Sequence, residues 1–188
     1  MSLILGILAQ DVAGAGGGTS YESIATANLG GTQATITFDN ISSSYTHLQL
    51  RGIARVGGGS SGGSENIYLR FNSDTGSNYS FHYMYGDGSS SASGSGANQS
   101  LILAGKPAAG GDISNNFGAF VTDILDYTNS NKHTTVRTLT GIDNNSNGVL
   151  FFSSGVWRNT NAVTRIDLTA GTDYVQYTHI ALYGIKGV

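Results

Sequence analysis

The chain has 188 residues, of which 39% are hydrophobic, so it is long enough for one buried core and short for two. Only 11% of the residues are charged, about half the usual share, and glycine fills 28 positions. The formal net charge is −3, with nine scattered lysines and arginines and no cysteine. The negative net charge and the scattered basic residues argue against direct nucleic-acid binding. Without cysteine, the chain has neither disulfides nor cysteine-ligated zinc. A surface with so few charges suits contact with neighbouring subunits, and an extracellular β-sandwich is the alternative.

The first residues, MSLILGILA, are apolar and lack the basic leader of a secretory signal. They are also far shorter than the roughly 20 residues of a membrane span. We expect an extended arm that docks on a neighbouring subunit through large aliphatic side chains, namely Leu3, Ile4, Leu5, Ile7 and Leu8. An extra strand on the chain's own domain is the open alternative. The glycine-rich residues 14–19 indicate a hinge, which divides the chain into an arm over residues 1–19 and a domain over residues 20–188.

The domain shows the period of two that is typical of β-strands, and no window has helical periodicity with caps. Ala34, Ile36 and Phe38 share one face of the first such run. About ten strands are predicted, over residues 34–38, 48–50, 67–71, 79–85, 100–104, 117–127, 134–142, 148–158, 162–169 and 174–185. Clusters of Gly, Ser, Asn and Asp separate them, with long loops expected at 57–64 and 86–98. The predicted fold class is therefore all-β: a single antiparallel β-sandwich, with the jelly roll as the expected variant.

Candidate catalytic carboxylates are scarce. Asp123 and Asp126 form the nearest pair within one predicted strand, but their odd spacing places them on opposite faces. The chain has only two glutamates, Glu22 and Glu65. A glycosidase needs two carboxyl groups roughly 5 to 10 Å apart, so the sequence predicts that the protein is not an enzyme.

Metal and cofactor motifs are not found in the sequence either. The four histidines are dispersed without ligand spacing. Residues 143–148 (DNNSNG) superficially resemble the start of a calcium loop but lack its alternating acidic ligands and final Glu, so a hairpin turn is the better interpretation. No phosphate-binding glycine loop is present. We expect no cofactor and no metal.

The aromatic residues allow two interpretations. Tyr79, Tyr83 and Tyr85 alternate along one run and share a face, which is either core or an exposed platform on which a glycan could stack. For Trp157 we expect core packing with a hydrogen-bonded indole N–H.

Several long stretches carry a resemblance to known proteins. They are residues 20–26 (SYESIAT), 46–55 (THLQLRGIAR), 69–89 (LRFNSDTGSNYSFHYMYGDGS), 117–127 (FGAFVTDILDY), 154–158 (SGVWR) and 175–187 (VQYTHIALYGIKG). Together they resemble small virion structural proteins of tailed bacteriophages, often from aquatic environments and mostly of unassigned function. The resemblance runs from residue 20 to the end, and the short apolar start is also similar.

This resemblance implies a virion component and supplies no catalytic residue. The leading expectation is a capsid decoration (cement) protein on the outer surface of the capsid, bound to the major capsid protein and to copies of itself. A tail-fibre or tail-associated receptor-binding protein that recognises glycans is the alternative, and a glycan-degrading enzyme ranks last. We expect a homo-oligomer, a trimer first and a dimer second, with neither nucleic acid nor membrane as a partner.

Overall fold

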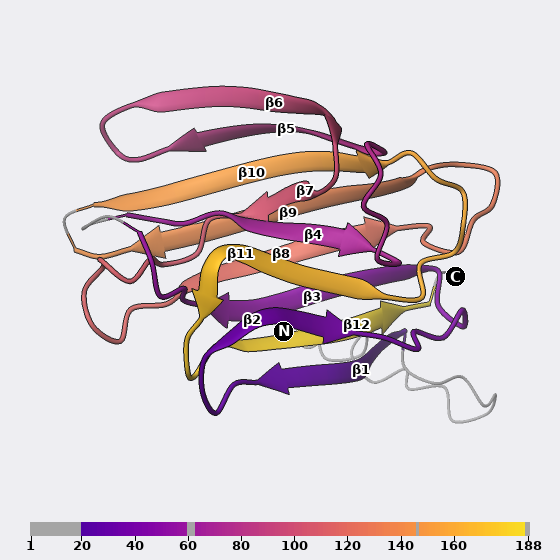
Figure 1. Ribbon diagram of the computed structural model, residues 1–188, viewed down its shortest axis with the longest axis horizontal. Helices are drawn as coiled ribbons and strands as arrows, with labels where there is room; N and C mark the ends of the chain where they lie inside the picture. Colours follow the sequence, from indigo (N-terminus) through magenta and orange to yellow (C-terminus); the bar gives the residue numbers. More distant parts are fainter. Residues whose placement is uncertain (1–19, 60–62, 146, 187–188) are drawn as a thin grey trace, which may run out of the picture.

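A computed structural model of the protein describes residues 20–59, 63–145 and 147–186. These residues form twelve β-strands and no helix (Figure 1). The strands are β1 (Tyr21–Asn28), β2 (Gln33–Phe38), β3 (His47–Ala54), β4 (Ile67–Phe71), β5 (Tyr79–Gly86), β6 (Ser91–Gln99), β7 (Ile102–Gly105), β8 (Gly118–Leu125), β9 (Thr134–Asp143), β10 (Gly148–Trp157), β11 (Ile166–Tyr174) and β12 (His179–Ile185). The described part of the chain thus holds no helix long and apolar enough to cross a bilayer.

The strands form two sheets that pack face to face. The large sheet has eight strands in the order β1-β12-β3-β8-β9-β10-β5-β6, and the small sheet has four in the order β2-β11-β4-β7. Neighbouring strands in both sheets run antiparallel. The predicted all-β, antiparallel sandwich is confirmed, and the strand order is consistent with the jelly-roll variant.

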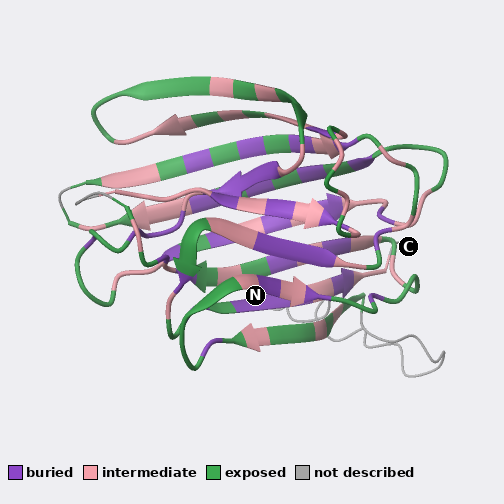
Figure 2. Ribbon diagram, viewed as in Figure 1, coloured by how far each residue is buried: buried purple, intermediate pink, exposed green. Residues whose placement is uncertain are grey.

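Alternation along each strand decides which side chains enter the space between the sheets. In β9, Val136 and the threonines at 134, 138 and 140 are buried, whereas Thr135, Arg137 and Leu139 are exposed. Figure 2 shows the same alternation as bands along β9 and β10. A period of two places successive side chains on opposite faces, so one face of the large sheet meets the small sheet and the other faces away.

Aromatic residues fill one end of the core. The Trp157 ring is 1% exposed and lies 5.6 Å from the Phe71 ring and 6.3 Å from the Tyr79 ring, between centroids. Its indole N–H donates to Oδ2 of Asp74 across 2.8 Å. The predicted role of Trp157, core packing with a satisfied N–H, is confirmed.

The strand count differs from the expected ten because two strands were not predicted. Residues 91–99 form β6 rather than part of a long loop, and β1 precedes the first predicted strand. The single strand predicted over 174–185 is instead the end of β11, a turn with Tyr177 at a φ of 69°, and β12. The interpretation of residues 143–148 as a hairpin turn is confirmed, since Gly148 pairs with Asp143 at the β9–β10 connection.

The two sheets differ in width, and this determines what stays uncovered. β7 is the edge of the small sheet and lies against β9, β10 and β5 of the large one. β6 lies beyond this edge, at the top of Figure 1. The small sheet therefore leaves the β6 side of the sandwich open.

Candidate interaction surface

The face of the large sheet that points away from the small sheet is called the outer face here. Its side chains form cross-strand rows because the strands are paired in register. One row runs from Tyr183 of β12 through Gln49, Asp123 and Arg137 to Ser154 of β10. Directly opposed side chains in antiparallel strands lie about 4.5 to 5.5 Å apart, so each row forms a line of contacts across the sheet.

The row through Gln49 is polar and internally hydrogen-bonded. Gln49 Nε2 donates to Asp123 Oδ1 across 2.6 Å, and Arg137 Nη2 donates to Asp123 Oδ2 across 2.7 Å. The Gln49 Oε1 atom accepts from Tyr21 Oη at 2.5 Å and from Arg51 Nε at 2.7 Å. These bonds connect four strands, from β1 to β9, with β12 between β1 and β3.

Electrostatics keep Asp123 ionised at the centre of this network. Partial burial of its carboxyl group opposes ionisation, but hydrogen bonds from Gln49 and Arg137 and the nearby guanidinium groups outweigh it. The pKa of Asp123 therefore lies below its ordinary value. Since the carboxylate is already engaged by two partners, it fixes the side chains of this row rather than serving as a proton donor.

The next two rows are largely apolar. Val121, Leu139, Phe152 and Met84 are opposed in sequence across β8, β9, β10 and β5. The adjacent row runs from Ile53 through Ala119 and Gly141 to Leu150. We call the apolar side chains of these rows the apolar patch: Ile53, Met84, Ala119, Val121, Leu139, Leu150 and Phe152.

The patch is open to solvent. The exposed fractions are 44% for Ile53, 60% for Met84, 52% for Leu139, 68% for Leu150 and 41% for Phe152. These are five of the eight large hydrophobic side chains exposed among the described residues. Single exposed apolar side chains are common on soluble proteins, whereas a contiguous group on a sheet face marks an interaction site.

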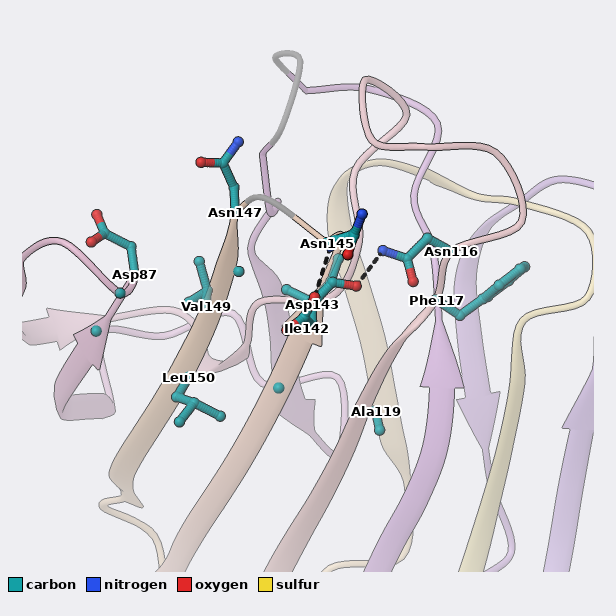
Figure 3. Close-up of a pocket in the computed structure, with 14 residues that line it drawn as sticks. Asp87, Asn116, Phe117, Ala119, Ile142, Asp143, Asn145, Asn147, Val149 and Leu150 are labelled. Carbon is teal, nitrogen blue, oxygen red and sulfur yellow. Dashed lines mark hydrogen bonds between the residues drawn. The ribbon is translucent and has the colours of Figure 1, made fainter.

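A cavity of about 890 Å³ adjoins the patch at the end of the row that contains Leu150 (Figure 3). Ala119, Gly141 and Leu150 belong to its wall on the sheet side. Its rim includes Asp87, Asn116, Asp143, Asn145 and Asn147. Asn116 Nδ2 donates to the carbonyl oxygen of Asp143 across 2.8 Å, which joins two of these rim residues.

The rim offers carboxylates and amides but no evident catalytic pair. Asp87 accepts hydrogen bonds from the backbone N–H groups and hydroxyls of Ser89 and Ser90. The backbone N–H of Ser89, and then the other three donors, hold the pKa of Asp87 far below its ordinary value. Its carboxylate therefore caps the 87–90 turn. Asp143 similarly accepts from the N–H of Asn145 at 2.7 Å.

The sequence-predicted site residues fall in three different places. The arm residues Leu3, Ile4, Leu5, Ile7 and Leu8 lie outside the described residues. Tyr79 is fully buried, and its hydroxyl donates to the carbonyl oxygen of Phe71 at 3.2 Å. Burial, followed by weaker effects, raises the pKa of Tyr79 to about 12. It belongs to the core, so no ring face is open to a glycan.

Tyr83 and Tyr85 share the inward face with Tyr79, as the alternation predicted, but they are only half-buried. Tyr83 stacks on Phe151 at 5.4 Å and on Tyr85 at 6.4 Å, between ring centroids. Nζ of Lys106 lies 5.8 Å from the centre of the Tyr85 ring. These two tyrosines therefore form a half-open aromatic group beyond the edge of the small sheet.

The carboxylates considered for catalysis bind different partners. Asp123 contacts Gln49 and Arg137, whereas Asp126, at a φ of 51°, pairs with Lys132 and lies 3.4 Å from Nδ1 of His47. Among the described residues, no group of three or more His, Asp or Glu side chains is placed to hold a metal ion.

The apolar patch was not recognised from the sequence, although its large residues lie in predicted strands, apart from Ile53, which follows the strand predicted over 48–50. The available signal was strands with apolar side chains on both faces, such as Val149, Leu150, Phe151 and Phe152 in β10. Comparisons with protein-family models, with curated proteins and with solved structures found no match.

Proposed function

We propose that this chain is a non-enzymatic structural protein of a tailed-phage virion, which decorates the capsid and bridges neighbouring capsomers. The observation that carries the proposal is the apolar patch on the outer face, where Leu139, Leu150 and Phe152 are each at least 41% exposed. The resemblance of the sequence to phage virion proteins supports the same assignment. The expected partner of the patch is the major capsid protein.

The patch suits adhesion better than chemistry. Removing apolar surface from water contributes about 25 cal/mol per Å², and the strand pairing holds these side chains in place before contact. Little conformational entropy remains to be lost by the backbone when a partner docks. In the neighbouring polar row Asp123 is already paired with Arg137, which lowers the cost of desolvating these two charges.

The test is binding of the purified full chain to capsids that lack it, measured by co-sedimentation. The double variant Leu150→Ser/Phe152→Ser should keep its circular dichroism spectrum and lose binding at least tenfold. Tyr177→Ser is the matched control, because Tyr177 is 66% exposed but belongs to the turn before β12 and not to the patch. Undiminished binding of the double variant would contradict the proposal.

Copy number provides a second, independent measurement. Quantification against the major capsid protein in purified virions should give hundreds of copies for a decoration protein. A count in the tens or fewer would contradict capsid decoration and favour a tail location.

One observation favours the second candidate, a tail-associated glycan-binding protein. Tyr85 and Lys106 line a cavity of about 340 Å³ together with Ser64, Asp87 and Ser89. An aromatic ring beside hydroxyls and charged groups is suited to a sugar, whose ring has an apolar face and polar edges. Binding of saccharides on a glycan array that is lost in Tyr85→Ala and kept in Tyr177→Ser would support this candidate over the first.

A further inference from the structure

The edge strand β6 lacks the usual protection against pairing with another chain over residues 91–96. It pairs with β5 on one side, and no strand among the described residues pairs with its other side. Residues 91–99, SASGSGANQ, contain neither a charged residue nor a proline. Natural sheet edges are commonly protected by lysines, prolines, bulges or very short strands.

The other edge of the same sheet is better protected. β1 has a register shift between Ser23 and Ala25 and carries Glu22, which is paired with Lys186 at 2.7 Å. In β6 the irregularity is confined to the end near Gln99, whereas the pairs from Gly86–Ser91 to Phe81–Gly96 are continuous. A regular, uncharged edge therefore extends over six residues, 91–96.

The inward side of β6 is shaped by the aromatic residues of β5. A Cβ atom at Gly94 would lie 2.5 Å from Oη of Tyr83, and one at Gly96 would lie 2.6 Å from Cζ of Phe81. The two rings therefore lie sideways across β6, with their tips over its backbone. Both rings are only half-buried, because the small sheet ends at β7 and does not extend over β6.

We propose that β6 pairs antiparallel with β6 of a second copy of this chain, about a two-fold axis. In such a pairing the same surface meets itself, so a charge near the axis would face its own copy. An uncharged strand is the charge pattern that this arrangement requires. Main-chain hydrogen bonds would hold the two strands together, as in other cases of strand addition.

The aromatic rings give the arrangement an apolar layer as well. Strands in a sheet are about 4.8 Å apart, so the two copies of β5 would be about 14 Å apart, with two β6 strands between them. In each copy, the Tyr83 and Phe81 rings already reach from β5 across to the backbone of β6. Rings from the two copies would thus meet over the seam and cover each other's exposed edges. This inference needs neither the virion assignment nor the apolar patch.

The experiment measures the mass of the full chain by sedimentation equilibrium at about 100 μM. We expect a dimer in the wild type. The variants Ser93→Lys and Ser95→Lys place a charge on exposed positions of β6 and should raise the dimer dissociation constant at least tenfold. Thr26→Lys is the matched control, because it adds the same charge at an exposed position on the opposite edge strand. Circular dichroism checks that each variant is folded.

Cysteine cross-linking adds a readout that does not depend on weakening the dimer. The chain has no cysteine, so single cysteines at Ser93, Ser95 and Ala97 report the seam directly. At least one of them should give a disulfide-linked dimer on mild oxidation, whereas Thr26→Cys should not. A monomeric or trimeric wild type would overturn the inference. The inference would also be overturned if neither Ser93→Lys nor Ser95→Lys raised the dimer dissociation constant. It would be overturned as well if the dimer dissociated in Leu150→Ser/Phe152→Ser, and that outcome would leave the proposed function intact.

Discussion

Asp74 lies at the end of the Trp157 indole and joins it to the turn after β4. Its Oδ2 accepts from the indole N–H at 2.8 Å and from Asn78 Nδ2 at 3.0 Å, while Oδ1 accepts from the N–H of Gly76 at 2.8 Å. Asp74→Ala leaves a buried N–H unsatisfied, so we expect a loss of about 1 to 3 kcal/mol in the free energy of unfolding. Urea denaturation measures it. Asp39→Ala, at an exposed aspartate, should change the value by less than about 0.5 kcal/mol.

The same contact predicts a dependence on pH. The hydrogen bond from Trp157, followed by that from Asn78, lowers the pKa of Asp74 below its ordinary value. A carboxyl group with a depressed folded-state pKa stabilises the fold above its unfolded pKa, which is about 3.9, and this stabilisation is lost as the pH falls through the folded pKa. Stability should therefore fall below about pH 4, with a change in the emission of the single tryptophan. Asp74→Asn should show a shallower decline, and an identical slope would refute this role for Asp74.

Thr122 and Thr138 form a buried hydroxyl pair between the sheets, with their Oγ1 atoms 2.8 Å apart. Thr122→Val alone leaves the Thr138 hydroxyl without its partner and should destabilise the protein by about 1 to 3 kcal/mol. The double variant Thr122→Val/Thr138→Val should come close to the wild type, because both polar groups are removed and the shape is kept. Thermal unfolding of the four proteins in a double-mutant cycle measures the coupling. Additive effects would show that the pair contributes no coupling.

Arg55 holds the loop that leads to the cavity rim. Its guanidinium donates to the carbonyl oxygens of Gly110, Asp112, Ile113 and Asn116 at 2.7 to 3.1 Å. A lysine ammonium cannot reproduce this planar fork. Arg55→Lys should therefore speed hydrogen exchange at residues 110–116 while β9 stays protected. Arg137→Lys serves as the control, since Arg137 makes a single surface contact with Asp123, and equal protection in both variants would contradict the role of Arg55.

Deletion of residues 1–15 tests the arm. The described residues already form both sheets and a continuous core, so we expect the truncated domain to fold with a similar melting temperature. Its incorporation into the assembly should be weaker if the arm docks as proposed, because the five large aliphatic side chains that would be buried on a neighbouring subunit are removed. A much lower melting temperature of the isolated subunit would show that the arm is a strand of its own sandwich. Normal folding together with normal assembly would leave the arm without a structural role.

The sequence allowed the fold class to be predicted because alternation is local. Ile67, Leu69 and Phe71, for example, repeat with a period of two and all three are fully buried. β6 gave no such signal, since its side chains are small and polar. It becomes a strand because its backbone can hydrogen-bond to β5. Its glycines at 94 and 96 leave room for the rings of Tyr83 and Phe81, which a Cβ atom there would meet. That requirement for glycine arises between strands and cannot be read from residues 91–99 alone.

The candidate surface was harder to predict for a related reason. Leu139 and Phe152 alternate correctly with Thr138 and Phe151, but alternation does not state which face a second sheet will cover. The unequal widths of the two sheets became visible only with the strand order. Tyr79 and Tyr83 show the same limit: they share one face of one strand, yet only Tyr79 is covered completely.

The last two strands complete both sheets. β12 lies between β1 and β3, and β11 lies between β2 and β4, so strands from the first half of the chain are joined through residues 166–185. Pairing between the ends of a chain requires closure of a long loop, and domains dominated by such contacts fold slowly, in milliseconds to seconds. During synthesis β1 and β2 have no lateral neighbour until residues 166–185 have left the ribosome, because β1 pairs only with β12 and β2 only with β11 among the described strands. Both sheets are therefore completed late in synthesis, in a step that adds β11 and β12 to the two layers together.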